Sequence, residues 1–150
     1  MMRVLRKAWG HAHRPSVFVD TWGWLELAAG NDAVLDLRRQ SQRSGVAWVT
    51  TDYILDEAIT RLFKTSPFRL ADAFFVEVFR GCDAGGLVVE LITKERFESA
   101  YRLRLRYRDK PNISFTDFTS FVVMQELGLR RVLTADAHFL HVGMGFERVP

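Results

Sequence analysis

The chain has 150 residues, of which 48% are hydrophobic and 13% aromatic. This is enough apolar material for one domain with its own core, and it excludes an intrinsically disordered protein. No apolar run approaches the roughly 20 residues that span a bilayer, and the N-terminus lacks a continuous apolar signal segment. We therefore expect a cytoplasmic protein with no membrane association.

The formal net charge of +3 is unevenly distributed. Residues 1–14 contain four basic residues and no acid, whereas the remaining chain has 17 basic against 18 acidic residues. This asymmetry predicts a basic, poorly ordered N-terminal extension over 1–14 and a globular domain over 15–150. Such an extension is either a solvated tail or an arm that contacts phosphates.

The first half of the domain alternates short apolar runs with amphipathic segments. Residues 16–20 form an apolar run that ends in an acid, which is typical of a buried strand. A short helix is expected over 22–28, and an amphipathic helix over 32–44 ends before a glycine. Residues 46–50 predict a second strand, and a helix over 51–64 follows it directly.

Capping signals organise the next part of the chain. Ser66 is expected to cap a helix in which Pro67 takes the first position. Residues 87–92 predict a third strand, and Thr93 is the expected N-cap of the following helix. Arginine alternates with apolar or aromatic residues over 102–108, and this pattern alone would fit an edge strand. The Thr93 cap and the helical spacing of the apolar residues before this segment favour a helix instead.

The last part of the chain contains an acid at the start of an apolar helix. This acid is Asp117, and the helix ends at Gly128. A strand is expected over 131–134, a turn over 135–140 and a last strand over 146–149. The alternation of strands and helices predicts an α/β protein, a three-layer α/β/α sandwich with a mainly parallel central sheet.

Four acids are expected to meet at one edge of this sheet. In open α/β sheets, the carboxyl ends of the strands and the first turns of the following helices share one crevice. Asp20 and Asp136 end predicted strands, while Glu57 and Asp117 lie in early turns of helices. Four carboxylates repel one another unless a cation compensates, and Mg²⁺ or Mn²⁺ prefers such oxygen ligands. Helix capping alone is the alternative explanation for an acid at a helix start.

Four segments resemble, in order, the acidic motifs of PIN-domain nucleases. They are Val17–Thr21, Tyr53–Ala58, Ser114–Asp117 and Leu133–Phe139. The resemblance covers about residues 16–150 and is strongest to the VapC-like toxins of type II toxin–antitoxin systems. It implies an α/β/α fold, endoribonuclease activity that depends on Mg²⁺ or Mn²⁺, a homodimer, and a small antitoxin whose tail enters the active-site groove.

The resemblance also implies roles for individual residues. Asp20, Glu57 and Asp117 would be the principal metal ligands, with Asp136 as a fourth acid that serves a second ion or acts through water. Small hydroxyl residues beside these acids would orient the carboxylates or contact substrate phosphate: Thr21, Ser114 and Thr116. For the last two, a helix-capping role is an equal alternative.

Basic residues near the end of the helix that follows Thr93 are candidates for contact with RNA. They can neutralise phosphates, although a solvated helix face is an equal alternative. This patch consists of Arg102, Arg104, Arg106, Arg108 and Lys110. His138, in the fourth motif, is expected to support its turn rather than act as a general base.

These observations predict an endoribonuclease that hydrolyses RNA phosphodiesters with a metal-activated water, as the toxin of a toxin–antitoxin pair. One alternative is a catalytically inactive PIN-like module that binds RNA or a protein. Another is a haloacid-dehalogenase-like phosphatase with Asp20 as its nucleophile. That family has a second acid two residues later, where this chain has Trp22.

Overall fold

The computed structural model describes residues 14–150. The predicted N-terminal extension therefore lies outside the described residues, apart from Arg14. The Arg14 guanidinium donates hydrogen bonds to the carbonyl oxygens of Gly45, at 2.9 Å, and Gly85, at 3.0 Å. Arg14 is thereby attached to the loops that precede two strands, and it belongs structurally to the domain.

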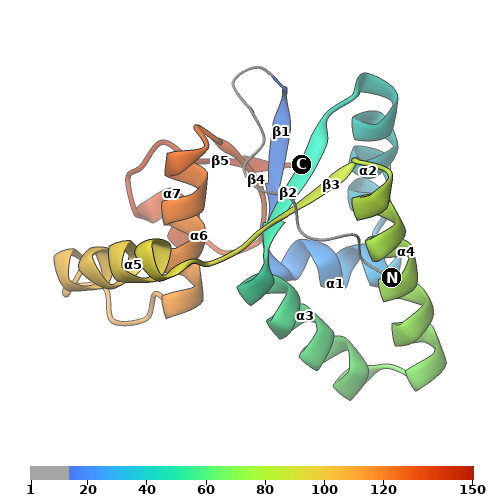
Figure 1. Ribbon diagram of the computed structural model, residues 1–150, viewed down its shortest axis with the longest axis horizontal. Coiled ribbons are helices and arrows are strands. Elements are labelled where there is room, and N and C mark those ends of the chain that lie inside the picture. The colour runs from blue at the N-terminus through green and yellow to red at the C-terminus, as the bar shows by residue number, and fades with distance from the viewer. Residues whose placement is uncertain (1–13) are drawn as a thin grey trace.

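A sheet of five parallel strands forms the centre of the molecule (Figure 1). Its spatial order is β3-β2-β1-β4-β5. The central strands are short and apolar because helices cover both faces of a parallel sheet. The strands are β1 (Ser16–Val19), β2 (Ala47–Thr51), β3 (Leu87–Glu90), β4 (Arg131–Leu133) and β5 (Glu147–Val149).

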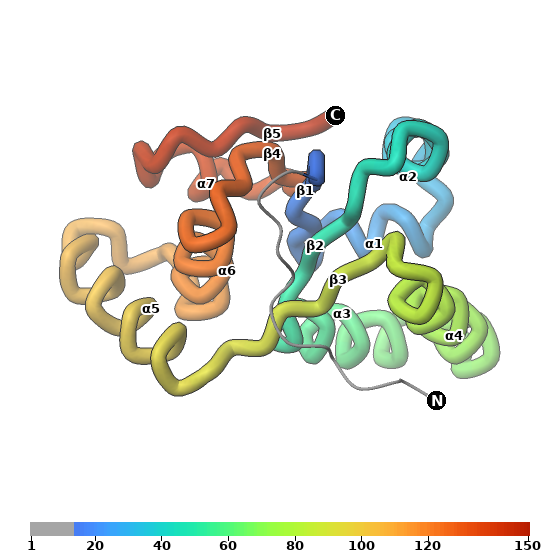
Figure 2. The backbone as a smooth tube through the Cα atoms, turned by 45° about the horizontal axis from the view of Figure 1, so that its top comes forward, coloured from blue at the N-terminus to red at the C-terminus, as the bar shows by residue number. Residues whose placement is uncertain are grey.

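Helices cover both faces of the sheet, which confirms the three-layer α/β/α sandwich (Figures 1 and 2). None of the helices within residues 14–150 has both the length and the apolar character that crossing a bilayer requires. One group consists of α1 (Thr21–Ala29), α2 (Asp32–Ser44), α3 (Asp52–Thr65) and α4 (Phe68–Asp83). The other group consists of α5 (Lys94–Arg106), α6 (Phe115–Glu126) and α7 (His138–His141).

The direction of the chain across the sheet reverses at β1. Strands β2 and β3 extend the sheet on one side of β1, whereas β4 pairs with its other side. The carboxyl ends of β1 and β4 are consequently adjacent, and the Asp20 N–H donates to the Leu133 carbonyl at 3.1 Å. A reversal of this kind opens a crevice at the carboxyl edge of the sheet.

Helix α1 approaches this reversal point closely at Gly23. A Cβ atom on Gly23 would lie 2.8 Å from the Leu133 side chain and 2.9 Å from that of Val19. Glycine therefore permits the contact between α1 and the sheet, and this contact fixes the helix that starts at Thr21.

Aromatic side chains fill the core on both sides of the sheet. Trp48 is fully buried, and its indole N–H donates to Ser41 Oγ at 3.0 Å. Trp24 is also buried, and its indole donates to Thr50 Oγ1 at 3.1 Å. On the other side, the ring of Phe121 meets those of Phe118 and Phe139 edge to face. The tryptophan contacts hold α1 and α2 against β2, and the phenylalanine contacts hold α6, which carries Asp117, against α7.

Most predicted elements are present, but three local features differ. Helix α4 begins at Phe68, without a side-chain cap. The Ser66 N–H instead donates to the Leu62 carbonyl and ends α3. Strand β3 stops at Glu90, and the Ile92 N–H donates to Asp52 Oδ1 at 2.9 Å. The expected turn over 135–140 contains the short helix α7.

Candidate active site

Asp20 directly follows β1 at the carboxyl edge of the sheet. Its side chain is only 7% exposed, and its Oδ2 accepts a hydrogen bond of 2.8 Å from Thr134 Oγ1. Burial raises the pKa of Asp20 above its ordinary value, and repulsion from Asp136 and Glu57 adds to the rise. The carboxylate of Asp20 is therefore held in a dry environment near other negative charges.

Asp117 reaches the same crevice from the first turn of α6. Its backbone N–H donates to Ser114 Oγ at 3.1 Å, so Ser114 is the N-cap of this helix. The Asp117 side chain is 7% exposed. Burial raises its pKa to about 7, with further contributions from repulsion by Asp20 and Asp136. Such a shift is common where carboxylates are collected for function.

Glu57 lies on α3, at a more exposed position than the two buried aspartates. Its Oε2 accepts a hydrogen bond of 3.0 Å from Thr21 Oγ1, and Arg61 Nη1 lies 3.5 Å from its Oε1. Thr21 thus links the start of α1 to the Glu57 carboxylate. Glu57 also lines an open pocket of about 430 Å³ together with Tyr53, Asp56, Thr60, Arg61 and Thr116.

Asp136 is attached to Asp20 through Thr134. Thr134 Oγ1 donates to Asp20 and accepts the backbone N–H of Asp136 at 2.9 Å. One buried hydroxyl therefore positions two of the four acids. The sequence prediction did not assign this role to Thr134, although a threonine two residues before an aspartate is a recognisable turn signal.

His138 lies closer to the acids than its expected role as a turn support implied. Its backbone N–H donates to Asp136 Oδ1 at 2.8 Å. Its Nδ1 lies 3.1 Å from the same oxygen and 3.4 Å from Asp117 Oδ2. His138 therefore both supports the turn and contacts two carboxylates.

The four acids predicted from the sequence come together around two buried aspartates. Candidate ligand atoms of Asp117, Asp136 and His138 all lie within 4.8 Å of one another. Asp20 repels Asp117, and Glu57 repels Asp20, so both acids lie near this group. A hard divalent cation fits these residues, because most of the candidate ligand atoms are carboxylate oxygens. The positive charge of the cation would also offset the repulsion among the carboxylates.

The predicted basic patch is divided by the structure. The Arg104 guanidinium donates to the carbonyl oxygens of Ile113, at 3.0 Å, Lys110, at 2.9 Å, and Tyr107. It also lies over the ring of Phe118, 4.7 Å from the centroid. These contacts favour a structural role for Arg104, which holds the connection between α5 and α6, over the predicted contact with RNA.

The other arginines of the patch are exposed, as contact with RNA requires. Arg102 donates to Ser99 Oγ at 3.1 Å, on its own helix. Arg106, the last residue of α5, and Arg108, in the turn after it, are exposed. These positions are compatible both with binding phosphate and with a solvated surface.

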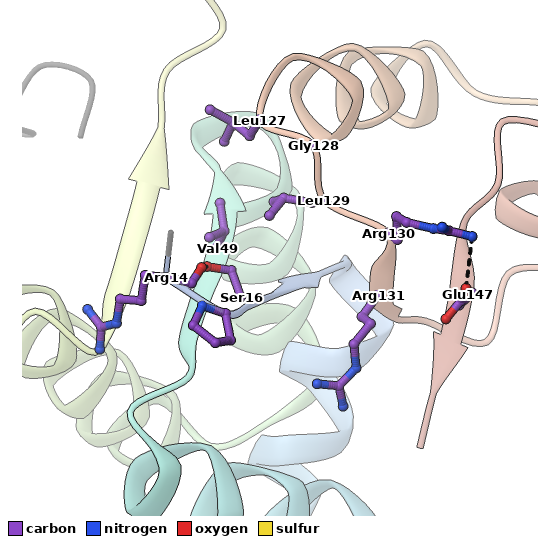
Figure 3. Close-up of a pocket in the computed structure, with 10 residues that line it drawn as sticks. Arg14, Ser16, Val49, Leu127, Gly128, Leu129, Arg130, Arg131 and Glu147 are labelled. Carbon is purple, nitrogen blue, oxygen red and sulfur yellow. Dashed lines mark hydrogen bonds and ion pairs between the residues drawn. The ribbon is translucent and has the colours of Figure 1, made fainter. Parts of the chain in front are cut away.

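A separate pocket of about 540 Å³ lies at the opposite edge of the sheet (Figure 3). Ser16, Arg131 and Glu147, the first residues of β1, β4 and β5, contribute to its lining. An ion pair of 3.0 Å joins Arg130 to Glu147 there. Because the four acids lie at the carboxyl edge of the sheet and none of them lines this pocket, the pocket is not part of the acid cluster.

Comparisons with known proteins identify the family. Residues 17–144 match the family model of the PIN domain. The chain belongs to the PIN-domain family. A solved structure, the toxin VapC20 of Mycobacterium tuberculosis, which cleaves the sarcin–ricin loop, is 27% identical, with a TM-score of 0.66. The match covers 85% of this chain and 95% of VapC20. No curated protein matched the sequence significantly.

These comparisons confirm the predicted resemblance to PIN-domain, VapC-like toxins. Together with the fold, they support a nuclease of the toxin class. They lend no support to the haloacid-dehalogenase-like alternative. The sheet topology explains why acids so distant in sequence come together, because each lies at a strand end or in the first turns of a helix.

Proposed function

We propose that this PIN-domain protein is an endoribonuclease that depends on Mg²⁺ or Mn²⁺ and acts as the toxin of a toxin–antitoxin pair in the cytoplasm. The observation that carries the proposal is the convergence of Asp20, Glu57, Asp117 and Asp136 from four separate segments. A favourable position near a helix start would explain Asp117 or Glu57 alone, but not the convergence of all four acids. Two of them are buried together, which costs free energy and is therefore hard to explain by stability.

The cation would be held by the buried carboxylates of Asp20 and Asp117, assisted by Asp136 and Glu57. When bound, it supplies positive charge that acidifies a water molecule and offsets charge on the phosphodiester. The protein itself orients the carboxylates: Thr134 holds Asp20 and Asp136, while Thr21 holds Glu57. His138 Nδ1 limits the movement of Asp136, 3.1 Å away.

RNA would contact basic residues on the last turns of α5 and in the segment that follows it. Arg102, Arg106, Arg108 and Lys110 are the candidates for phosphate contacts, and Arg61 and Thr116 line the pocket next to Glu57. VapC20 is a toxin that cleaves the sarcin–ricin loop. We propose a structured RNA as the substrate of this chain as well.

A second copy of the chain and a small antitoxin are the proposed protein partners. Helix α5 carries three exposed apolar side chains at helical spacing, Phe97 (45% exposed), Tyr101 (54%) and Leu105 (54%). This stripe is a candidate surface for a homodimer, because exposed apolar stripes commonly mark protein contacts. The antitoxin would place its tail in the groove beside the acids.

Cleavage of structured RNAs tests the proposed activity. A panel that includes a sarcin–ricin stem-loop is incubated with the protein in Mg²⁺, Mn²⁺ or EDTA. Wild type is expected to cut at least one RNA with either cation and none in EDTA. Asp117→Asn should lose at least about a hundredfold in rate, whereas the exposed, matched variant Asp72→Asn should cut like wild type. Cleavage that survives EDTA or Asp117→Asn contradicts the mechanism.

The rival function is an inactive module that binds RNA or a protein. Binding of RNA without cleavage under either cation would favour it. Expression in growing cells tests the toxin role: growth should stop with wild type, continue with Asp117→Asn, and recover when a cognate antitoxin is co-expressed. Harmless expression of an active enzyme would contradict a toxin.

A further inference from the structure

A small pocket adjoins the acid cluster on the side of α7. Its volume is about 210 Å³, and His138 belongs both to its lining and to the acid cluster. The Nδ1 atom of His138 lies 3.4 Å from Asp117 Oδ2. The His138 side chain therefore separates the pocket from the acids of the proposed cleavage site. Its lining residues are Asp109, Lys110, Pro111, Asn112, Ile113, His138 and His141.

The loop over residues 107–113, which forms one side of this pocket, is held by side-chain contacts. Arg104 donates to three carbonyl oxygens in residues 107–113. Ile113 is buried, and the Tyr107 hydroxyl donates to the Val142 carbonyl at 3.2 Å, next to α7. The loop and α7 are thus fixed relative to each other, so the pocket is preformed and a ligand need not order it.

The chemistry of the lining suits a nucleotide. The side chains of Asn112 and His141 make no hydrogen bond or ion pair within residues 14–150, so their polar atoms are available to a ligand. Lys110 Nζ has Asp109 as a distant partner at 4.0 Å, and the Asp109 side chain is 72% exposed. A lysine binds phosphate, an imidazole stacks on an unpaired base, and an amide reads a base edge.

We propose that this pocket binds the nucleotide adjacent to the cleaved phosphodiester in a single-stranded RNA segment. Lys110 contacts its phosphate, His141 stacks on its base, and Asn112 hydrogen-bonds to the base edge. The inference deepens the proposed nuclease function and rests on it for the identity of the ligand. It assigns substrate selection to the connection between α5 and α6 and to α7, rather than to the acids.

Binding of a fluorescent single-stranded RNA octanucleotide, measured by anisotropy in EDTA, tests the pocket without cleavage. The double variant Lys110→Ala/His141→Ala should bind about tenfold more weakly than wild type. Lys110→Ala alone should reduce the slope of log affinity against log salt by about 0.7, the value for one phosphate contact to a single strand. Asn112→Ala should change the preference among octanucleotides of different base composition. Arg131→Ala, which removes a positive charge at the opposite edge of the sheet, is the matched control and should bind like wild type.

The outcomes separate this proposal from the nuclease proposal. If the protein cuts no RNA but the double variant still weakens binding, the nucleotide pocket stands and the nuclease function fails. If the double variant binds like wild type, or wild type binds no octanucleotide, the pocket assignment is overturned even when cleavage is observed. Thermal unfolding of each variant shows whether it is folded, and Asn112→Ala, at an exposed side chain, provides a second variant if the double variant unfolds.

Discussion

Replacing Asp117 with asparagine should make the metal-free protein more stable at neutral pH, although the same change is expected to lower the cleavage rate. The Asp117 pKa is raised from 3.8 to about 7, chiefly by burial and then by repulsion from Asp20 and Asp136. Between these two values the folded state binds more protons than the unfolded state, so stability falls as pH rises. A rise of about three units in the pKa corresponds to a loss of at most about 4 kcal/mol in the free energy of unfolding.

Urea denaturation between pH 4 and pH 8 in EDTA measures this effect. Between pH 4 and pH 8, the free energy of unfolding of wild type should fall by up to about 4 kcal/mol more than that of Asp117→Asn. The loss should be complete slightly above pH 7, the folded-state pKa. Asp117→Asn should therefore equal wild type near pH 4 and exceed it at pH 8. Asp72→Asn, at an exposed position on α4, should follow wild type throughout.

Adding Mg²⁺ or Mn²⁺ at pH 8 extends the test. A cation that binds the folded acids should stabilise wild type by RT ln(1 + [L]/Kd) and stabilise Asp117→Asn less. Parallel curves for wild type and Asp117→Asn across the whole pH range would refute the reasoning, because they would show that the Asp117 carboxyl is ionised at little cost in the folded protein.

Three further changes test other parts of the structure. Thr134→Val should lower the free energy of unfolding in urea by about 1–3 kcal/mol and lower the cleavage rate. The reason is that the Asp136 N–H and the Asp20 carboxylate lose the hydroxyl to which both are hydrogen-bonded. Unchanged stability and rate would contradict that role. Gly23→Ala should cost about 1–3 kcal/mol in thermal unfolding, since its Cβ would overlap the Leu133 and Val19 side chains; a neutral change would show that α1 can move. Phe97→Glu should shift a dimer toward monomer in analytical ultracentrifugation, and an unchanged mass would exclude this stripe as the interface.

The order of strands and helices could be predicted because local signals were strong and consistent. The apolar run that ends at Asp20 and the cap at Thr93 each fix an element without reference to the rest of the chain. The position of Asp20 and Asp117 at one edge followed from the general geometry of parallel sheets. This convergence also predicted mutual repulsion, which contributes to the raised pKa values. The extent of burial, which is their largest cause, could not be read from these signals because it depends on what packs around the two carboxylates.

Other features depended on contacts that local sequence does not encode. Thr134 and Asp20 are 114 residues apart, so their hydrogen bond appears only when β1 and β4 lie side by side. Arg104 resembled its exposed neighbours in the basic patch, but its guanidinium donates hydrogen bonds to carbonyl oxygens of the following loop. Sequence alone does not say which way a long side chain on a helix turns.

The pairing of β1 with β4 also sets when the site can form during synthesis. A ribosome delivers Asp20 and Glu57 well before β4, and until β4 pairs with β1, Thr134 cannot hold the Asp20 carboxylate. Contacts this distant in sequence also form slowly, because a long loop must close first. A partly synthesised chain would therefore lack an assembled acid cluster, which can form only after β4 and Thr134 have emerged from the ribosome and β4 has paired with β1.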